Sequence, residues 1–269
     1  MTQSNENAPP GVNPEVPHSA RIYDYWLGGK DNFAADRRVG EAMLQAIPGM
    51  RAMAAENRKF VHRAARDLVD KEGIRQFLDI GTGIPTRPNL HEIAQRIAPE
   101  TRVVYVDNDP IVLVHARALM VSSAQGRSEY IAADIREPES ILTEKALLAT
   151  LDLTQPVGLT LIAILMLLAD RDDPWALVAR LRDALPSGSI LAITHPTADF
   201  NPAAVGEAVA AARGAGMTLV ARTKDEVARF FGDWELLEPG IVPTSAWRPD
   251  APVDDPEATY YWAGVARKP

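Results

Sequence analysis

The sequence predicts an α/β fold in which a mostly parallel sheet carries helices on both of its faces. Short apolar runs alternate with helix-like stretches between residues 76 and 195, a pattern typical of parallel strands joined by helices. The first run ends in a Gly-Thr-Gly turn, the position at which ligands of open α/β sheets bind. Two further apolar runs near the end of the chain are joined by a Pro-rich loop, which predicts an antiparallel pair.

A helical segment precedes this sheet. Apolar residues recur at helical spacing until residues 48–49 (Pro-Gly) end the run, and a second helical pattern continues to near Gly73. Residues 1–17 are rich in Pro and Asn and carry few large apolar groups, which predicts a disordered or loosely draped tail. We therefore expect this tail, a helical cap at 18–72 and the main domain at 73–269.

Seven strands are expected in the main domain. The five parallel strands are expected at residues 76–80, 101–107, 128–134, 157–165 and 189–195. The antiparallel pair is expected at residues 234–242 and 259–267. These positions give a sheet whose parallel part comes first along the chain and whose antiparallel part comes last.

Two helices between the strands have clear start signals. Asp173 is a good N-cap and Pro174 suits the first helical position. Thr223 and Glu226 form a capping box for a later helix. The buried stripe of the first of these helices is expected to comprise Trp175, Val178, Leu181 and Leu185.

The composition limits the classes of partner. The 269 residues carry a formal net charge of -8, and a polyanion such as nucleic acid would meet repulsion over most of this surface. The chain has no cysteine, which excludes thiolate metal ligands and cysteine nucleophiles. The N-terminus shows no secretory signal, and the longest apolar run, 157–169, is shorter than the roughly 20 residues that cross a bilayer. We expect a cytoplasmic protein without a membrane segment.

The stretch LDIGTGIPT contains the first candidate site. The strand ends in Asp79, and Gly81, Thr82 and Gly83 form a turn in which the backbone can approach a ligand closely. A dinucleotide fingerprint would place a third glycine where this chain has Thr86. The Asp79 carboxylate would also repel a pyrophosphate, whereas it would favour an ammonium and a sulfonium. A tight strand-to-helix turn without a ligand is the alternative.

Two further carboxylates follow the next strands. Asp107 ends the second strand, where it can accept hydrogen bonds from both hydroxyls of a ribose, and its neighbour Asn108 is a further candidate for ligand contact. Asp134 follows the third strand, where it can accept from an exocyclic adenine amine while Ile135 contacts the ring. Asp134 is alternatively a helix or turn cap. Asp109 can do the capping near Asp107, which leaves Asp107 free for a ligand.

These features resemble class I S-adenosylmethionine-dependent methyltransferases, which carry an acid at each of these strand ends. The segments ARIYDYWLGGKDNFAADR, RKFVHRAARDL, IRQFLDIGTGIPT and YYWAGVARKP further resemble one bacterial S-adenosyl methyltransferase family, formerly known as a domain of unknown function. The resemblance implies a Rossmann-like core and S-adenosyl-L-methionine as cofactor, but no known substrate. It implies a donor site at Asp79, Gly81, Gly83, Asp107 and Asp134. Family members usually carry a histidine soon after the fourth strand, where this chain has Met166.

The resemblance also gives a role to YDYWLGGKDNF, residues 23–33. We expect this segment to fold over the strand ends, so that Tyr23, Gly29, Lys30 and Asn32 line or close the cofactor pocket. Lys30 is the candidate for the methionine carboxylate. The alternative is that the aromatic residues form the core of the cap and that Lys30 lies in a solvated turn.

Methyl transfer is an in-line displacement in which alignment and exclusion of water supply much of the acceleration. A hydroxyl or amine acceptor can also need a base, and His195 at the end of the fifth strand is the best-placed candidate. A lone histidine is more often structural, and Tyr23, Tyr25 and Arg136 are weaker candidates. The remaining histidines have no ligand-like spacing, so no metal site is predicted.

The acceptor is expected to be a small molecule. Without cysteine, the thiolate-dependent mechanism of pyrimidine methylation is excluded. The fourth strand also lacks the Asp/Asn-Pro-Pro-aromatic tetrad of base-amino methyltransferases. Two rival hypotheses are a non-catalytic protein that binds S-adenosylmethionine or S-adenosylhomocysteine as a ligand sensor, and an NAD-dependent oxidoreductase. Homo-oligomer formation is left open.

Overall fold

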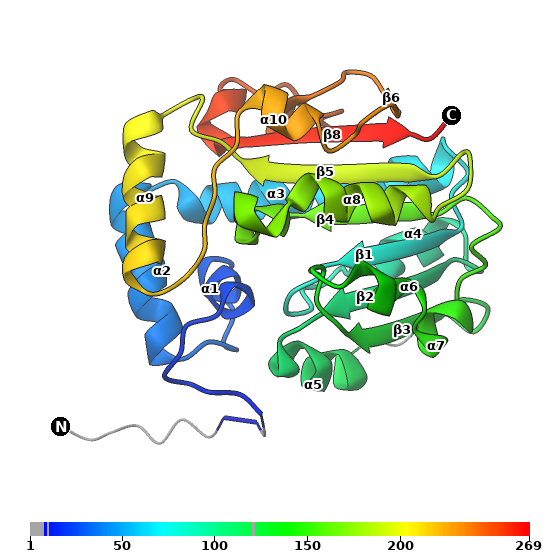
Figure 1. The fold of residues 1–269 in the computed structure, drawn as a ribbon, viewed down its shortest axis with the longest axis horizontal. Coiled ribbons are helices and arrows are strands. Elements are labelled where there is room, and N and C mark those ends of the chain that lie inside the picture. The colour runs from blue at the N-terminus through cyan, green and yellow to red at the C-terminus, as the bar shows by residue number, and fades with distance from the viewer. Residues whose placement is uncertain (1–7, 10, 120–121) are drawn as a thin grey trace.

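The computed structural model describes residues 8–9, 11–119 and 122–269, so residues 1–7 and 10 of the predicted tail lie outside the described residues. A mixed eight-stranded sheet crosses the molecule in the order β3–β2–β1–β4–β5–β8–β6, with β7 also pairing with β8 (Figure 1). The strands are β1 (Gln76–Ile80), β2 (Arg102–Asp107), β3 (Arg127–Ala132), β4 (Gly158–Ile162), β5 (Ile190–Pro196), β6 (Glu235–Leu236), β7 (Val242–Pro243) and β8 (Tyr261–Arg267). β1 to β5 pair in parallel and β8 pairs antiparallel with β5, β6 and β7, which confirms the predicted architecture.

The number of strands differs from the prediction. The expected strand at 234–242 is two short strands, β6 and β7, because Pro239 and Gly240 interrupt it. Proline has no N–H to donate to the ladder, and Gly240 has a positive φ of 83° in a turn whose N–H donates to Leu237 O. β4 is also shorter than predicted, since Ala163 turns the chain out of the sheet with a φ of 52°.

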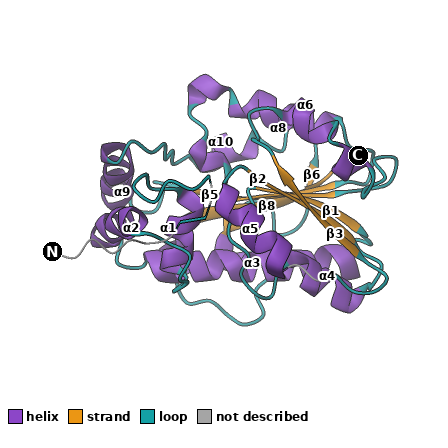
Figure 2. Ribbon diagram, turned by 90° about the horizontal axis from the view of Figure 1, so that it is seen from below, coloured by secondary structure: helices purple, strands orange, loops and turns teal. Residues whose placement is uncertain are grey.

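Helices cover both faces of the sheet (Figure 2). On one face lie α3 (Met50–Asp70) and α4 (Leu90–Ile97), and on the other α6 (Pro138–Leu142), α7 (Lys145–Leu148), α8 (Pro174–Asp183) and α10 (Lys224–Ala228). Successive strand residues point to opposite faces. Phe77 therefore packs with the α3–α4 core, whereas the adjacent Leu78 packs with the α8–α10 core.

Both predicted helix start signals are confirmed, and the predicted buried stripe of α8 is confirmed except at one residue. The Asp173 side chain accepts from Ala176 N at the start of α8, and Thr223 and Glu226 form the predicted capping box of α10. The predicted stripe residues of α8 are buried except Trp175, which is half-buried and stacks on Phe230. Phe230 lies just after α10, so this contact joins two helices of the same face.

The segment predicted as the cap, 18–72, contains α1 (Ser19–Trp26), α2 (Ala34–Ala46) and α3, whose second half also packs against the sheet. A helix for which we made no prediction, α9 (Pro202–Gly214), packs alongside α2 (Figure 1). Its start signals are visible in the sequence, because Asn201 caps Ala204 N and Pro202 takes the first position. α5 (Pro110–Leu119) lies beside β3 and contributes Ile111 and Val112 to a small separate core.

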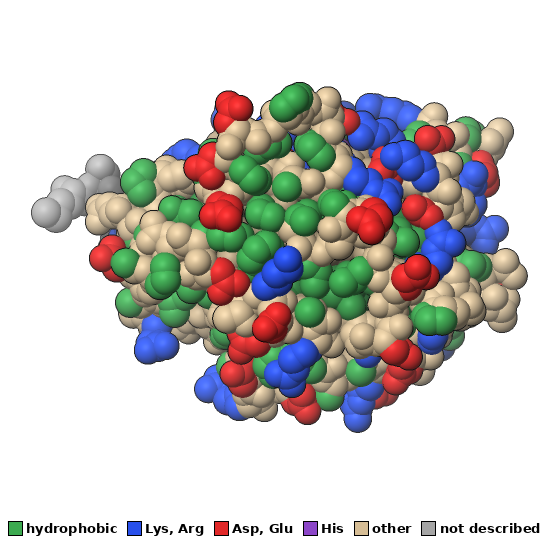
Figure 3. Space-filling model, turned by 90° about the horizontal axis from the view of Figure 1, so that it is seen from above, with side chains coloured by type: hydrophobic (Ala, Val, Ile, Leu, Met, Phe, Trp, Pro, Cys, Tyr) green, Lys and Arg blue, Asp and Glu red, His purple; other side chains and the backbone are tan. Residues whose placement is uncertain are grey.

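The surface carries charges of both signs. On the face shown in Figure 3, acidic side chains lie among the basic ones and among apolar side chains. A search of the described helices finds none with the length and apolar character needed to cross a bilayer.

Candidate functional site

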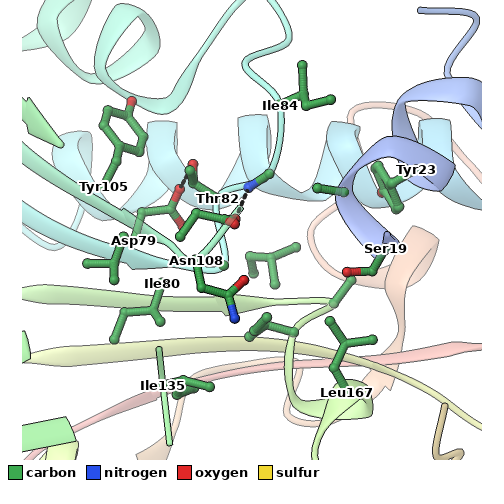
Figure 4. Close-up of a pocket in the computed structure, with 18 of the residues that line it drawn as sticks. Ser19, Tyr23, Asp79, Ile80, Thr82, Ile84, Tyr105, Asn108, Ile135 and Leu167 are labelled. Carbon is green, nitrogen blue, oxygen red and sulfur yellow. Dashed lines mark hydrogen bonds between the residues drawn. The ribbon is translucent and has the colours of Figure 1, made fainter. Parts of the chain in front are cut away.

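A cavity of about 310 Å³ lies at the carboxyl ends of β1, β2 and β4 and beneath α1. In Figure 4, Ser19 and Tyr23 project from α1 on one side of this cavity, and Asp79 and Thr82 lie on the opposite side. Of the predicted cofactor residues, the cavity is lined by Tyr23, Asp79, Gly81, Thr82, Gly83, Asp107, Asn108, Asp134 and Ile135. The three predicted carboxylates are therefore brought together around one space.

Asp79 is fixed by hydrogen bonds on both of its oxygens. Thr160, on the neighbouring strand β4, donates to Oδ1, and Thr82 donates to Oδ2 over 2.7 Å (Figure 4). Burial raises the pKa of the Asp79 carboxyl, and the hydrogen bonds from Thr160 and Thr82 lower it in part. The result is a carboxylate with a fixed orientation in a site of limited solvation, where a cation would be a favourable neighbour.

The two glycines after β1 serve different purposes. Gly81 has a φ of 77°, and a Cβ there would overlap the side chain of Ile164, so this position requires glycine for packing. Gly83 has a φ of 66°, and a Cβ there would meet nothing within 4 Å. The backbone at Gly83 therefore borders open space, as a close approach of ligand to backbone requires.

Asp107 is held by two backbone N–H groups, from Gly83 over 2.8 Å and from Asp109 over 3.0 Å. Burial raises its pKa, and these two hydrogen bonds lower it in part. Asp109 caps Ile111 N, as the sequence predicted, which leaves Asp107 facing the cavity.

Asp134 and Asn108 close the far end of the cavity. Asn108 donates to Asp134 Oδ2 over 2.9 Å, and the Arg136 side chain pairs with the same carboxylate over 3.2 Å. The Asp134 side chain also accepts from Arg136 N, which is the turn-capping role left open above. Ile135 is buried and lines the cavity beside it.

In the N-terminal segment, only Tyr23 of the four predicted residues lines the cavity. Its hydroxyl donates to Ala54 O and accepts from Asn57 Nδ2, each over 3.0 Å. Gly29 and Lys30 are exposed and do not line the cavity, and Asn32 is buried beneath the turn. These three residues therefore do not line the cavity, because the chain turns away from it after α1.

Two residues of this turn, Asp31 and Asn32, instead hold Asp24, a cavity residue that sequence reasoning missed. Asp24 lines the cavity, and its Oδ2 accepts from Asp31 N over 2.9 Å and from Asn32 Nδ2 over 2.8 Å. No described residue donates to its Oδ1. A Cβ at Gly29 would overlap the Asp24 carboxylate, so the second glycine makes room for it. The sequence signal for Asp24 was an acidic residue within the segment YDYWLGGKDNF, residues 23–33.

Arg58 is a second residue that sequence reasoning missed. It projects from α3 into the cavity and donates to Thr86 O over 2.8 Å and to Pro88 O over 3.3 Å. Its Nε has no hydrogen-bond partner, and no described carboxylate pairs with it. Its charge lowers the pKa of Asp79 in part, so the two groups are electrostatic neighbours at one end of the cavity.

His195 does not reach the cavity. It is fully buried, its Nδ1–H donates to Pro196 O, and its Nε2 accepts from Arg222 over 2.9 Å. Burial lowers its pKa to about 3, with the Arg222 charge acting in the same direction. Arg222 in turn donates to Leu165 O and Leu168 O. The prediction of a base is therefore wrong: His195 supports the segment that carries Met166.

The weaker base candidates are placed as follows. Tyr25 is half-buried, and its hydroxyl donates to the Glu41 carboxylate. Tyr25 does not line the cavity, but Arg136 lines it. Met166 also lines the cavity, from the short helix η1 (Leu165–Leu167) after β4. Among the residues that the structure describes, no group of His, Asp and Glu side chains is arranged to hold a metal ion.

Known proteins resemble this chain over nearly its whole length. The family model described as S-adenosyl methyltransferase matches residues 5–269. A crystal structure of a DUF574 family protein from Streptomyces avermitilis is 49% identical, with a TM-score of 0.93 and coverage of 95% of this chain and 99% of that chain. A methyltransferase candidate from Thermobifida fusca is 42% identical, with a TM-score of 0.88 and coverage of 97% and 98%.

A more distant structure shows the fold alone. A SAM-dependent methyltransferase from Anabaena variabilis is 13% identical, with a TM-score of 0.51 and coverage of 98% of this chain and 100% of that chain. No curated protein matches the chain. Because the family model and the two close structures cover nearly the whole chain, the resemblance inferred from sequence is confirmed, and the chain belongs to the S-adenosyl methyltransferase family.

Proposed function

We propose that this protein transfers the methyl group of S-adenosylmethionine to a small-molecule acceptor, and that the cavity beneath α1 binds both. The single observation that carries this proposal is the convergence of Asp79, Asp107 and Asp134 on one cavity from three successive strand ends. A cofactor with an ammonium, a ribose diol and an adenine amine offers one donor group to each carboxylate.

The residues present fit such a cofactor in order along the sheet edge. Asp79 would face the ammonium of the methionine end, and Arg58, whose charge no described carboxylate matches, would take its carboxylate. Asp107 would accept from the ribose hydroxyls, and the open space at Gly83 admits the sugar. Asp134 and Ile135 would contact the adenine. Arg58 thus replaces Lys30 in our assignment.

When bound, the sulfonium supplies an activated methyl group. The chain's own residues align the acceptor and exclude water, and α1, which belongs to the predicted cap at 18–72, covers the cavity. For an acceptor that must lose a proton, Asp24 is the candidate base. Burial raises the pKa of this carboxyl, which makes it a stronger base, and its Oδ1 is free of donors from the described residues.

A non-catalytic ligand sensor is the second candidate function, favoured by one observation, the burial of His195 away from the cavity. The two candidates differ in turnover. Isothermal titration with S-adenosylhomocysteine and with NAD measures which ligand binds. Turnover is then measured as release of S-adenosylhomocysteine from S-adenosylmethionine in the presence of a panel of phenols, amines and carboxylic acids. We expect submillimolar binding of S-adenosylhomocysteine, none of NAD, and turnover of one acceptor class. Binding without any turnover would favour the sensor.

A further inference from the structure

A second, smaller cavity adjoins the first, and we call it the apolar chamber. It has a volume of about 40 Å³ and lies between the cap, the carboxyl end of β5 and the amino end of β8. Its walls include Met43, Met50, Met53, Met166, Trp26 and Tyr261. Met166 also lines the main cavity, so this one side chain forms part of the wall between the two.

None of the described residues that line the chamber has a charged side chain. Its walls come from α1, α2, α3 and α9, which pack into one apolar cluster that Tyr261 joins from β8. The Trp26 N–H is already bonded to Gly40 O over 3.2 Å. A charged group would therefore lose its hydration on entering the chamber without gaining a partner, which is strongly unfavourable.

One polar group in the chamber is without a good partner. Tyr261 is 5% exposed, and the only acceptor for its hydroxyl among the described residues is the Met166 sulfur at 3.7 Å. A thioether is a weak acceptor, and a buried hydroxyl is normally hydrogen-bonded. The Tyr261 O–H is thus directed at the boundary between the chamber and the main cavity with most of its hydrogen-bonding capacity unused.

The methionines make the chamber adaptable. Four of the chain's seven methionines line it, and unbranched thioether side chains reshape around a ligand at low cost. The space as it stands suits only a small group, and movement of Met166 would join it to the main cavity. Binding sites of this kind are largely apolar, with a few placed polar groups that set orientation.

We propose that the apolar chamber is the acceptor's specificity site, and that it takes a single uncharged ring bearing one hydroxyl or amino group. The ring packs against the methionines, and its polar atom meets the Tyr261 hydroxyl at the boundary beside Met166. This proposal rests on the proposed function for the role of the ligand as acceptor, although binding of the ring to the chamber is measurable without turnover.

The test is binding of phenol, benzene and benzoate to the full chain, by ligand-observed NMR, with and without S-adenosylhomocysteine. Ala208, on α9, lines the chamber, whereas Ala210 on the same helix is exposed. We expect Ala208→Leu to weaken phenol binding about tenfold or more and Ala210→Leu to leave it unchanged. The affinity for S-adenosylhomocysteine should stay within about twofold in both variants, which also shows that they fold.

Tyr261→Phe provides a second variant that removes one oxygen and no packing. It should weaken phenol binding by about threefold to tenfold, the net contribution of one hydrogen bond, and leave benzene binding unchanged. Equal phenol binding by wild type and Ala208→Leu, or benzoate binding as tight as phenol binding, would overturn the proposal. Failure of wild type to bind S-adenosylhomocysteine while phenol still binds would instead contradict the proposed function.

Discussion

Gly29 lies directly against the carboxylate of Asp24, so closely that a Cβ at Gly29 would overlap it. We therefore predict that Gly29→Ala pushes the Asp24 carboxylate into the cavity that it lines and breaks its bonds to Asp31 N and Asn32 Nδ2. The displaced side chain should obstruct the cofactor and weaken binding of S-adenosylhomocysteine about tenfold. Calorimetry measures this change. Gly206→Ala is the matched control, since a Cβ there meets nothing within 4 Å, and it should leave the affinity unchanged.

The contact between Gly29 and Asp24 also predicts that the effects of substitutions at these two positions on affinity are strongly coupled. In an Asp24→Ala background the obstructing carboxylate is gone, so Gly29→Ala should have little further effect on affinity. Additive losses in the double mutant would show that Gly29 acts through the backbone rather than through Asp24.

Arg58 is predicted to recognise the carboxylate of the methionine end. Arg58→Met should lower the affinity for S-adenosylhomocysteine by about 1.5–3 kcal/mol, because a hydrogen-bonded charge pair is lost. It should leave 5′-methylthioadenosine, which lacks that carboxylate, within about twofold of its wild-type affinity. Equal losses for both ligands would mean that Arg58 acts by holding the loop at Thr86 and Pro88.

Asp107 is predicted to bind the ribose. Asp107→Ala should weaken binding of S-adenosylhomocysteine and of 5′-methylthioadenosine alike, by about 1–3 kcal/mol, because both contain the ribose. Asp107→Asn keeps an acceptor oxygen for only one of Gly83 N and Asp109 N, which now donate to different oxygens, and its loss should lie between those of wild type and Asp107→Ala. Wild-type affinity in Asp107→Ala would refute the ribose assignment.

His195 is predicted to make stability depend on pH. Its pKa is about 3 in the folded protein, against about 6.5 in the unfolded chain. Between these values the unfolded chain binds a proton that the folded protein does not, so the free energy of unfolding falls as the pH falls below about 6.5. At pH 5 the loss amounts to about 2 kcal/mol.

The measurement is urea unfolding of wild type and His195→Gln between pH 7.5 and pH 5. Glutamine does not titrate but can still accept from Arg222. The difference in unfolding free energy between the two proteins should therefore shift by about 2 kcal/mol across this range. Parallel pH profiles would show that His195 is not buried in its neutral form.

The strand-end acids could be predicted because each depends on local sequence alone. An apolar run marks a strand and parallel strands end at one edge of the sheet, so Asp79 and Asp107, at the ends of two neighbouring strands, must lie near each other there. The double glycine was also visible in sequence. Its purpose was not, because the contact between Gly29 and Asp24 depends on the chain turning back after α1.

The alternation of side chains along β5 could have excluded His195 as a base in the cavity. It has the same parity along β5 as Leu191 and Ile193, which face the core beneath α8 and α10, so its side chain points there as well. The contact of Arg222 with His195 could not be predicted, because residues 215–222 follow an irregular path between α9 and α10. Arg58 was equally hidden, since nothing in a helical pattern distinguishes a cation that faces a cavity from one in solvent.

We propose that Asp79, Asp107 and Asp134 together bind one S-adenosyl nucleoside. A crystal structure of the complex with S-adenosylhomocysteine tests it most directly. We predict the amino-acid end between Asp79 and Arg58, the ribose hydroxyls within hydrogen-bond distance of Asp107, and the adenine against Ile135 with its amine at Asp134. A ligand bound elsewhere, or an adenine at the Asp79 end, would contradict this account.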